Sequence, residues 1–332
     1  MSNFLENYGK SIFVLVLIAI LIAFASPLGI KIKEYTLARV NETDKIGNDD
    51  INKTNGQITR PEEPTEAVDE IYCIYYDDGE MTISQNEIEP KEGKTVVKKG
   101  FFDSPIYCTQ IMTTVEFVGA VKPKSCYQWF KFCENLTEIK NMENLYLPSN
   151  ISGIFSFCKN LTSINLSNLN TSNVTNMKDM FGACYSLTSL DLSNFDTRKV
   201  TDMSNMFSGC EKLTSLNLSN FDTSKVMNMS NMFAGCNKLT SLKFGDNFDT
   251  SNVIDMSYMF LGTVLTSLDL SNFDTSNVTN MKGIFNASSL GVKSVKLSQS
   301  TFNKMNELAS NNGCSFYTYI QTSESCFDFE TN

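Results

Sequence analysis

Apolar side chains recur along this chain with two alternating spacings, seen most clearly in residues 187–207, LTSLDLSNFDTRKVTDMSNMF. Leu190 and Leu192 stand two residues apart, which places both on one face of a short strand. A turn-favouring stretch, NFDT, follows them. A second apolar group then has the spacing of one face of a short helix: Val200, Met203, Met206 and Phe207. Each unit is therefore predicted to contain a strand, a turn and a short helix.

The unit returns seven times between residues 129 and 285. The same phenylalanine of the unit falls at Phe130, Phe155, Phe181, Phe207, Phe233, Phe260 and Phe285. The steps between these positions are 25, 26, 26, 26, 27 and 25 residues. A fixed period of this length is the signature of a stacked solenoid, in which each unit covers its apolar edge only with its neighbours.

The strand positions follow from the apolar pairs. They are Val115–Phe117, Ile164–Leu166, Leu190–Leu192, Leu216–Leu218, Leu242–Phe244, Leu268–Leu270 and Val295–Leu297, with a degenerate copy near Ile139. Stacked in parallel, these eight segments form one continuous sheet. The predicted fold is an α/β solenoid of the leucine-rich-repeat type, with a parallel β-sheet on one face and short helices on the other.

Three stretches carry a resemblance to a known family. The unit at residues 265–285, LTSLDLSNFDTSNVTNMKGIF, resembles the 26-residue repeat of bacterial BspA-type leucine-rich-repeat surface proteins. Residues 74–82, IYYDDGEMT, and 124–130, KSCYQWF, resemble the segments that lead into that repeat. The resemblance covers about residues 71 to 300. It implies an exported, surface-displayed binding protein with a role in adhesion and no catalysis, and it carries over no set of binding residues.

The amino terminus contains the predicted membrane segment. Residues 11–30 form an uncharged apolar run that is long enough, as a helix, to cross a bilayer. This run is either an uncleaved signal anchor, the interpretation we prefer, or a signal peptide cleaved after Ala25. Lys31, Lys33 and Arg39 follow the run and favour a cytoplasmic side, whereas the family resemblance favours the exterior.

The remaining organisation follows from changes in composition. The predicted parts are an N-terminal flank (1–10), the transmembrane or signal-anchor helix (11–30), a flexible polar linker (31–70), an N-terminal β cap (71–125), the solenoid of about seven repeats (126–300) and a C-terminal cap (301–332).

Composition argues against several functions. The chain has 27 Lys and Arg against 37 Asp and Glu, and its formal charge of −10 disfavours a nucleic-acid partner. It contains no histidine, which removes the commonest general base and a common metal ligand. We therefore predict a protein that is not an enzyme and that needs no cofactor.

Five of the ten cysteines fall three residues after the repeat phenylalanine: Cys133, Cys158, Cys184, Cys210 and Cys236. The next two units have Thr263 and Ser288 there, so this cysteine column is interpreted as small buried side chains, with disulfides between neighbours or a metal site as alternatives. Outside the column, Cys73 with Cys108 and Cys314 with Cys326 are predicted as disulfides of the two caps.

A column of acidic residues follows each strand: Asp196, Asp222, Asp249 and Asp274, with Asn170 in an earlier unit. A stack of carboxylates could hold calcium. The interpretation we prefer is that each residue accepts a hydrogen bond in its own turn or caps the helix that follows it.

The outward side of the strands, here called the strand face, is the predicted binding surface. Its variable column is Asn165, Asp191, Asn217, Lys243 and Asp269, and its serine column is Ser163, Ser189, Ser215, Ser241 and Ser267. The face has no aromatic or arginine anchor, and the solubility of an exposed sheet accounts for the same residues.

The expected function is adhesion through the solenoid, by binding of a protein ligand on a host or neighbouring cell. The protein is expected to lie in the cell membrane through residues 11–30, with the solenoid extracellular, or to be secreted if the signal segment is cleaved. The alternative is a structural spacer or minor component of a surface assembly.

Overall fold

The computed structural model describes residues 60–101, 111–265, 267–285, 294–313, 315 and 328–331. All of them belong to one unit of the chain, Ile58–Asn332. The predicted membrane segment at 11–30 and residues 31–59 of the predicted linker lie outside the described residues. Among the helices that are described, none is long and apolar enough to cross a membrane.

The described part begins with a mixed sheet that starts the solenoid. Its strands are β1 (Tyr72–Tyr76), β2 (Glu80–Ser84), β3 (Val96–Phe101), β4 (Thr114–Phe117) and β5 (Glu138–Lys140), in the order β3-β1-β2-β4-β5. β1 pairs antiparallel with β2 and β3, whereas β2, β4 and β5 are parallel. The short 3₁₀ helix η3 (Met142–Asn144) follows β5. The parallel register of the coils is thus already set within the N-terminal cap.

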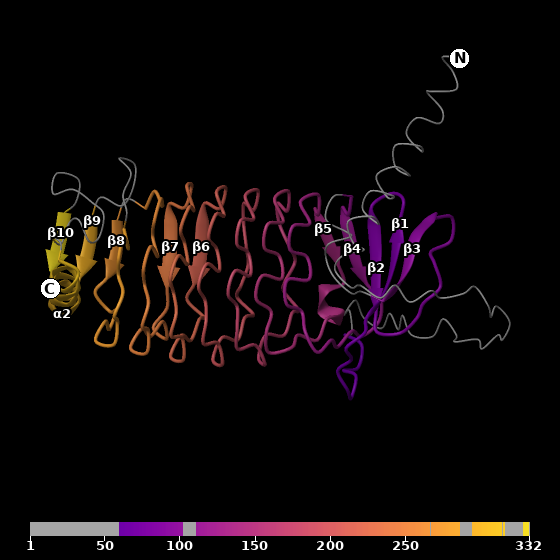
Figure 1. The fold of residues 1–332 in the computed structure, drawn as a ribbon, viewed down its shortest axis with the longest axis horizontal. Coiled ribbons are helices and arrows are strands. Elements are labelled where there is room, and N and C mark those ends of the chain that lie inside the picture. Colours follow the sequence, from indigo (N-terminus) through magenta and orange to yellow (C-terminus); the bar gives the residue numbers. More distant parts are fainter. Residues whose placement is uncertain are drawn as a thin grey trace, which may run out of the picture. The chain divides into compact units, whose positions relative to one another are not determined.

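Parallel strands return further along the solenoid. β6 (Ser215–Leu218) pairs with β7 (Ser241–Phe244), and β8 (Ser267–Leu270), β9 (Ser294–Leu297) and β10 (Asp328–Thr331) form a second parallel group. Leu216 pairs with Leu242, one repeat later, which confirms the predicted solenoid register. Figure 1 shows the coils of this unit following one another with their strands across the stacking direction.

A helix lies at the carboxy-terminal end of the stack. α2 (Gln299–Asn311) follows β9, and the hydroxyl of Ser298 caps it by accepting the amide of Thr301 at 3.2 Å. Its Met305 and Leu308 are buried in the core of the solenoid. The helix therefore covers apolar surface that the last coil cannot bury against a following repeat.

The prediction of one continuous eight-stranded sheet is wrong. Ile164–Leu166 and Leu190–Leu192 are not strands, although Leu166 and Leu192 are buried as expected, so the described strands divide into three sheets. At this point the amide of Thr188 bonds to the carbonyl of Thr162 at 3.0 Å, just before the predicted strands. The apolar spacing fixes which side chains are buried, but it does not fix whether the backbones meet along the whole segment.

The prediction of short helices opposite the strands is also wrong. Residues 204–209 form consecutive turns, in which Asn205 and Gly209 have left-handed φ values of 56° and 74°. A left-handed residue every four positions is incompatible with an α-helix, although the same apolar spacing fits turns equally well. The fold is therefore a β-solenoid with few helices.

The amides that would bond within the expected helix donate instead to carbonyl groups of the next coil. Met203 donates to the carbonyl of Asn228 at 3.0 Å, Asn205 to that of Ser230 at 2.9 Å, and Phe207 to that of Met232 at 3.0 Å. Parallel bridges mark the same contact along the stack: Asn150 to Asn176, Asn176 to Asp202, Asp202 to Asn228, Asn228 to Asp255 and Asp255 to Asn280. We call this set of coil-to-coil bonds the turn ladder.

The core is organised around a stack of phenylalanines. The seven repeat phenylalanines are buried, and consecutive rings lie nearly parallel with centroids 5.6 to 6.1 Å apart. A second, polar column runs beside them, in which Thr197 donates to the carbonyl of Asp222 at 2.8 Å and accepts its amide at 2.9 Å. The predicted core and repeat register are therefore confirmed.

Residues 60–69 lie against the first coils. The guanidinium carbon of Arg60 is 3.7 Å from the ring centre of Tyr146, and the hydroxyl of Tyr146 donates to the carbonyl of Pro61. Further along, the ammonium of Lys122 is 3.0 Å from the carboxylate of Glu63. Residues 60–69, here called the strap, belong to the range that was predicted as a flexible linker. The part of the chain that packs on the solenoid therefore begins before β1.

We predict that Phe207→Ala lowers the free energy of unfolding by about 3–5 kcal/mol, because the ring is fully buried between Phe181 and Phe233. Urea denaturation followed by circular dichroism measures the change. Met227→Ala, at a side chain that is 48% exposed, is the control and should change stability little. Equal effects of the two substitutions would contradict the assigned core.

Candidate binding surface

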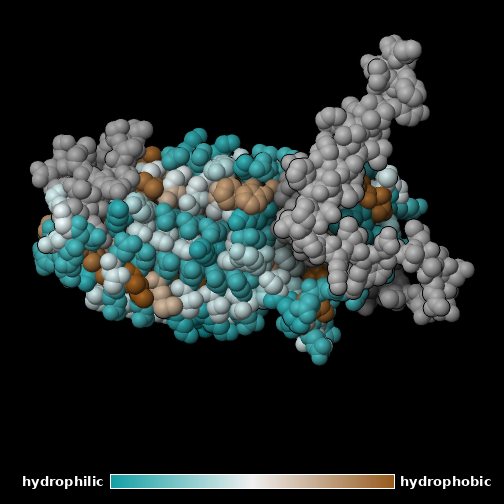
Figure 2. All heavy atoms as spheres, viewed as in Figure 1, coloured by the Kyte–Doolittle hydropathy of each residue, from teal (hydrophilic) through white to brown (hydrophobic). Residues whose placement is uncertain are grey.

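The strand face is exposed as predicted. Asn165, Asp191, Asn217, Lys243 and Asp269 are all exposed, and so are the serines of the serine column. Where strands pair, the columns are in register, with Ser215 opposite Ser241 and Asn217 opposite Lys243. Figure 2 shows hydrophilic side chains over most of the solenoid surface in view, with apolar side chains confined to small patches.

Four members of the variable column also close a turn. Each side chain accepts a hydrogen bond from the amide of the serine two residues later, at 3.1 Å for Asn165, 2.9 Å for Asp191, 3.1 Å for Asn217 and 2.9 Å for Asp269. These Asx turns hold the side chains in one orientation, and those at Asn217 and Asp269 lie at the ends of β6 and β8. The repeated Asx-x-Ser spacing thus serves the fold first, and it presents a rigid row of polar groups to solvent.

Lys243 is the exception in this column. Its side chain has no ion pair or hydrogen bond to the other described residues, and Gly245 takes the place of the turn serine. A Cβ atom on Gly245 would lie 2.0 Å from the carbonyl oxygen of Ser219 in the preceding coil. Glycine is required here because the two backbones approach too closely for any side chain.

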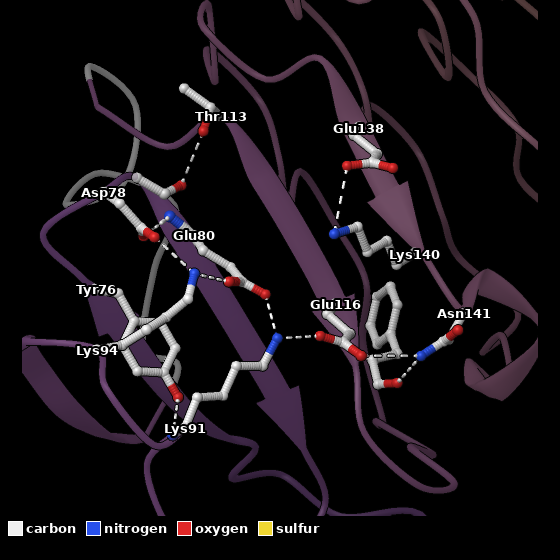
Figure 3. A network of polar contacts seen from close by, with 12 residues as sticks. Tyr76, Asp78, Glu80, Lys91, Lys94, Thr113, Glu116, Glu138, Lys140 and Asn141 are labelled. Carbon is white, nitrogen blue, oxygen red and sulfur yellow. Dashed lines mark hydrogen bonds and ion pairs between the residues drawn. The ribbon is translucent and has the colours of Figure 1, made fainter.

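An ion-pair network forms the N-terminal limit of the strand face (Figure 3). The ammonium of Lys91 bonds to the carboxylates of Glu80 and Glu116, and that of Lys94 bonds to Glu80 and, at 2.6 Å, to Asp78. Burial of Glu80 raises its pKa, but the two lysines outweigh burial and the net shift is downward. The network holds residues 91–94 over strand β2, whose side chains are all buried. The exposed part of the strand face therefore begins at β5, whose Glu138 and Lys140 are exposed.

The cysteine column has the structural role that was predicted. The thiols of Cys158, Cys184, Cys210 and Cys236 are buried, are not disulfide-bonded, and donate to carbonyl oxygens of the preceding coil at 3.1 to 3.3 Å. Burial raises the pKa of Cys184 and of Cys236 to about 12. The alternative of disulfides between neighbouring cysteines is wrong for these four, because each thiol is used as a hydrogen-bond donor.

The preferred interpretation of the acidic column, in which each side chain accepts a hydrogen bond in its own turn, is confirmed. The carboxylate of Asp222 accepts the amide of Ser224 at 3.0 Å, and Asp196, Asp249, Asp274 and Asn170 make the same contact two residues ahead. Each group is therefore satisfied by its own turn. Within the described residues, no three His, Cys, Asp or Glu side chains lie together in a way that could hold a metal.

The two predicted disulfides stay predictions. Cys73 is buried in strand β1, whereas Cys108, Cys314 and Cys326 lie outside the described residues.

One exposed aromatic pair was missed by the sequence analysis. Phe132 and Phe157 contact each other with ring centroids 4.8 Å apart, and 46% of Phe132 is exposed. The available signal was a departure from the repeat, because these phenylalanines occupy the position just before the column cysteine where later units have Gly209 and Gly235.

Stacked 26-residue coils, joined by strands and a turn ladder around a phenylalanine column, define a repeat-built β-solenoid. A family model described as "Mycoplasma protein of unknown function, DUF285" matches residues 124–241 and 212–318. The two matches overlap and together span residues 124–318, more than half of the chain, so the chain belongs to this family. A search of curated proteins finds no match.

We predict that acid weakens the fold in part through the turn aspartates. Hydrogen bonds lower the pKa of Asp191 (chiefly from the Ser193 amide), Asp269 (from the Ser271 hydroxyl) and Asp274 (from the Ser276 amide). Because the folded-state pKa lies below the unfolded value of about 3.9, this contribution is complete above that value and is lost as pH falls through the folded pKa.

The triple variant Asp191→Asn, Asp269→Asn and Asp274→Asn keeps the acceptor oxygens and removes the titration. Thermal midpoints measured between pH 7 and pH 2 should fall less for this variant than for the native chain. An equal fall in both proteins would show that these turns do not contribute to acid sensitivity.

We further predict that Cys184 and Cys236 resist alkylation while the protein is folded, because the reactive species is the thiolate and burial suppresses it. Iodoacetamide labelling with peptide mass spectrometry should modify both only after urea is added. Ser215→Cys on the strand face is the matched control and should be labelled in both states. Rapid native labelling of Cys184 would contradict the buried column.

Proposed function

We propose that this protein is an exported, surface-displayed solenoid without catalytic activity, of the BspA-type leucine-rich-repeat group, which binds a protein on a host or neighbouring cell. The strand face is the observation that carries the proposal. Its polar side chains stand in register along the coils and are held by Asx turns, so a partner would meet a surface that needs no ordering on binding. Affinity per molecule is expected to be weak and to be raised by display of many copies.

In this proposal residues 11–30 anchor the protein in the membrane with the solenoid outside, or the solenoid is secreted if that segment is cleaved. The cysteine column is compatible with an oxidising exterior. Thiols that are buried and already hydrogen-bonded do not need to be reduced by the compartment to stay intact.

A structural spacer in a surface assembly is the second candidate function. One observation favours it: four of the five variable-column side chains already use an oxygen to close their own turn. A face built for the fold alone would look the same. Binding measurements on the intact strand face and on its variants separate the two functions.

The location is tested by treating intact source cells with protease. Peptides from residues 71–332 should be released without lysis and identified by mass spectrometry. Full protection of an expressed protein would place the solenoid on the cytoplasmic side that Lys31 and Lys33 favour, and the adhesion proposal would be abandoned.

The face is tested with the variant Asp191→Asn, Lys243→Glu and Asp269→Asn, which changes the position and sign of the charges along the variable column at constant net charge and keeps both Asx turns. We expect saturable binding of the full chain to partner cells to fall about tenfold, as is usual when interfacial charges are altered. The thermal midpoint at pH 7 serves as the folding control. Unchanged binding would exclude the variable column as the contact, whereas no saturable binding of the native chain would favour the spacer.

A further inference from the structure

Phe132 and Phe157 adopt a backbone conformation that suits glycine. Their φ values are 65° and 62°, and the equivalent positions in later coils are Ala183 with a φ of 58° and Gly209, Gly235 and Gly262 with φ between 70° and 74°. A residue with a Cβ atom is strained there, and a large aromatic residue more than most. Strain kept at two neighbouring coils is an observation that points to function.

The strain is not offset by burial in the core. The repeat phenylalanines two residues earlier, Phe130 and Phe155, are fully buried, whereas Phe132 is 46% exposed and Phe157 is partly buried. The two exposed rings contact each other with an angle of 35° between their planes. They form a small apolar patch in contact with water, and Tyr127, five residues before Phe132, is 53% exposed as well. Clustered exposed aromatic side chains are a feature of contact sites.

Charged side chains border the aromatic pair. The ammonium of Lys131 lies 5.2 Å from the ring centre of Phe132, and Glu134 and Lys159 make an ion pair of 2.6 Å beside it. Burial raises the pKa of Asp179, although the charges of Lys178 and Lys131 act in the opposite direction. Lys131 has no ion-pair partner among the described residues.

We propose that Phe132 and Phe157, together with Lys131, form a docking point for an acidic peptide segment of a partner protein. An apolar side chain of the segment packs on the two rings, and a carboxylate beside it pairs with Lys131. Aromatic groups at the centre and charges at the rim are the arrangement that concentrates binding energy at protein interfaces. The proposal deepens the proposed function, since it names the partner chemistry of a binding solenoid.

A random-sequence peptide display library selected on the full-length chain tests this docking point. The peptides enriched should combine Asp or Glu with at least one large apolar residue. Phe132→Gly with Phe157→Gly should weaken their binding by about tenfold or more. The thermal midpoint of this variant should not fall, because glycine suits the positive φ.

Two further variants sharpen the result. Lys131→Glu should disfavour the acidic peptides and favour the same peptides with Lys in place of Asp and Glu. Met227→Ser with Ile254→Ser alters another exposed apolar pair, 48% and 46% exposed on adjacent coils, and should leave binding unchanged.

The proposal is overturned if the enriched peptides lack acidic residues, if no peptide is enriched, or if the glycine variant binds them as well as the native chain does. Equal loss in the Met227 and Ile254 variant, or displacement of the peptides by a soluble polysaccharide, would also overturn it. Protease release from intact cells does not involve the aromatic pair, so failure of the docking point and failure of the proposed location are told apart.

Discussion

Hydrogen bonding between the backbones of successive coils is the interaction on which the rest of this structure depends. The turn ladder takes every second amide of residues 203–209 away from its own segment and gives it to the next coil. Stacking of the coils then brings the phenylalanine rings to within 6.1 Å of each other and closes the core. No single coil could satisfy its amides or bury its apolar edge alone, so stability comes from the contacts between neighbours.

Such a ladder places equivalent residues of successive coils in columns. Only a few types of side chain fit at each position of a column. The cysteine column holds a small group that donates to a carbonyl of the preceding coil, and Thr263 fills the equivalent position with a hydroxyl that donates to the carbonyl of Phe260 in its own coil. The Asx columns need an acceptor two residues before an amide. The positive-φ column suits glycine or a small side chain, as at Gly209 and Ala183, so Phe132 and Phe157 stand apart from their equivalents by their size. A departure from a column is thus more informative about function than the column itself.

The sequence was sufficient to predict the features that depend on periodicity. The 26-residue register, the buried phenylalanines, the thiol column and the turn role of Asp222 were all predicted, because burial and turn chemistry follow directly from spacing and residue type. The helices were predicted wrongly, since the spacing of Val200, Met203 and Phe207 fits consecutive turns as well as a helix. The left-handed preference of Gly209 and Asn205 was the signal for turns. The breaks in the sheet and the exposure of Phe132 depend on how coils meet in space, which a pattern along one unit does not specify.

The strap of residues 60–69 has a mechanical consequence. A pull on the chain ahead of Arg60 reaches the contact between Arg60 and Tyr146 before it reaches strand β1, although Tyr146 lies some way along the chain in a later coil. The load therefore enters the stack at its side, several strands in from the edge strand β3. Force applied at this point is shared among bonds of adjacent coils instead of opening the first sheet one strand at a time.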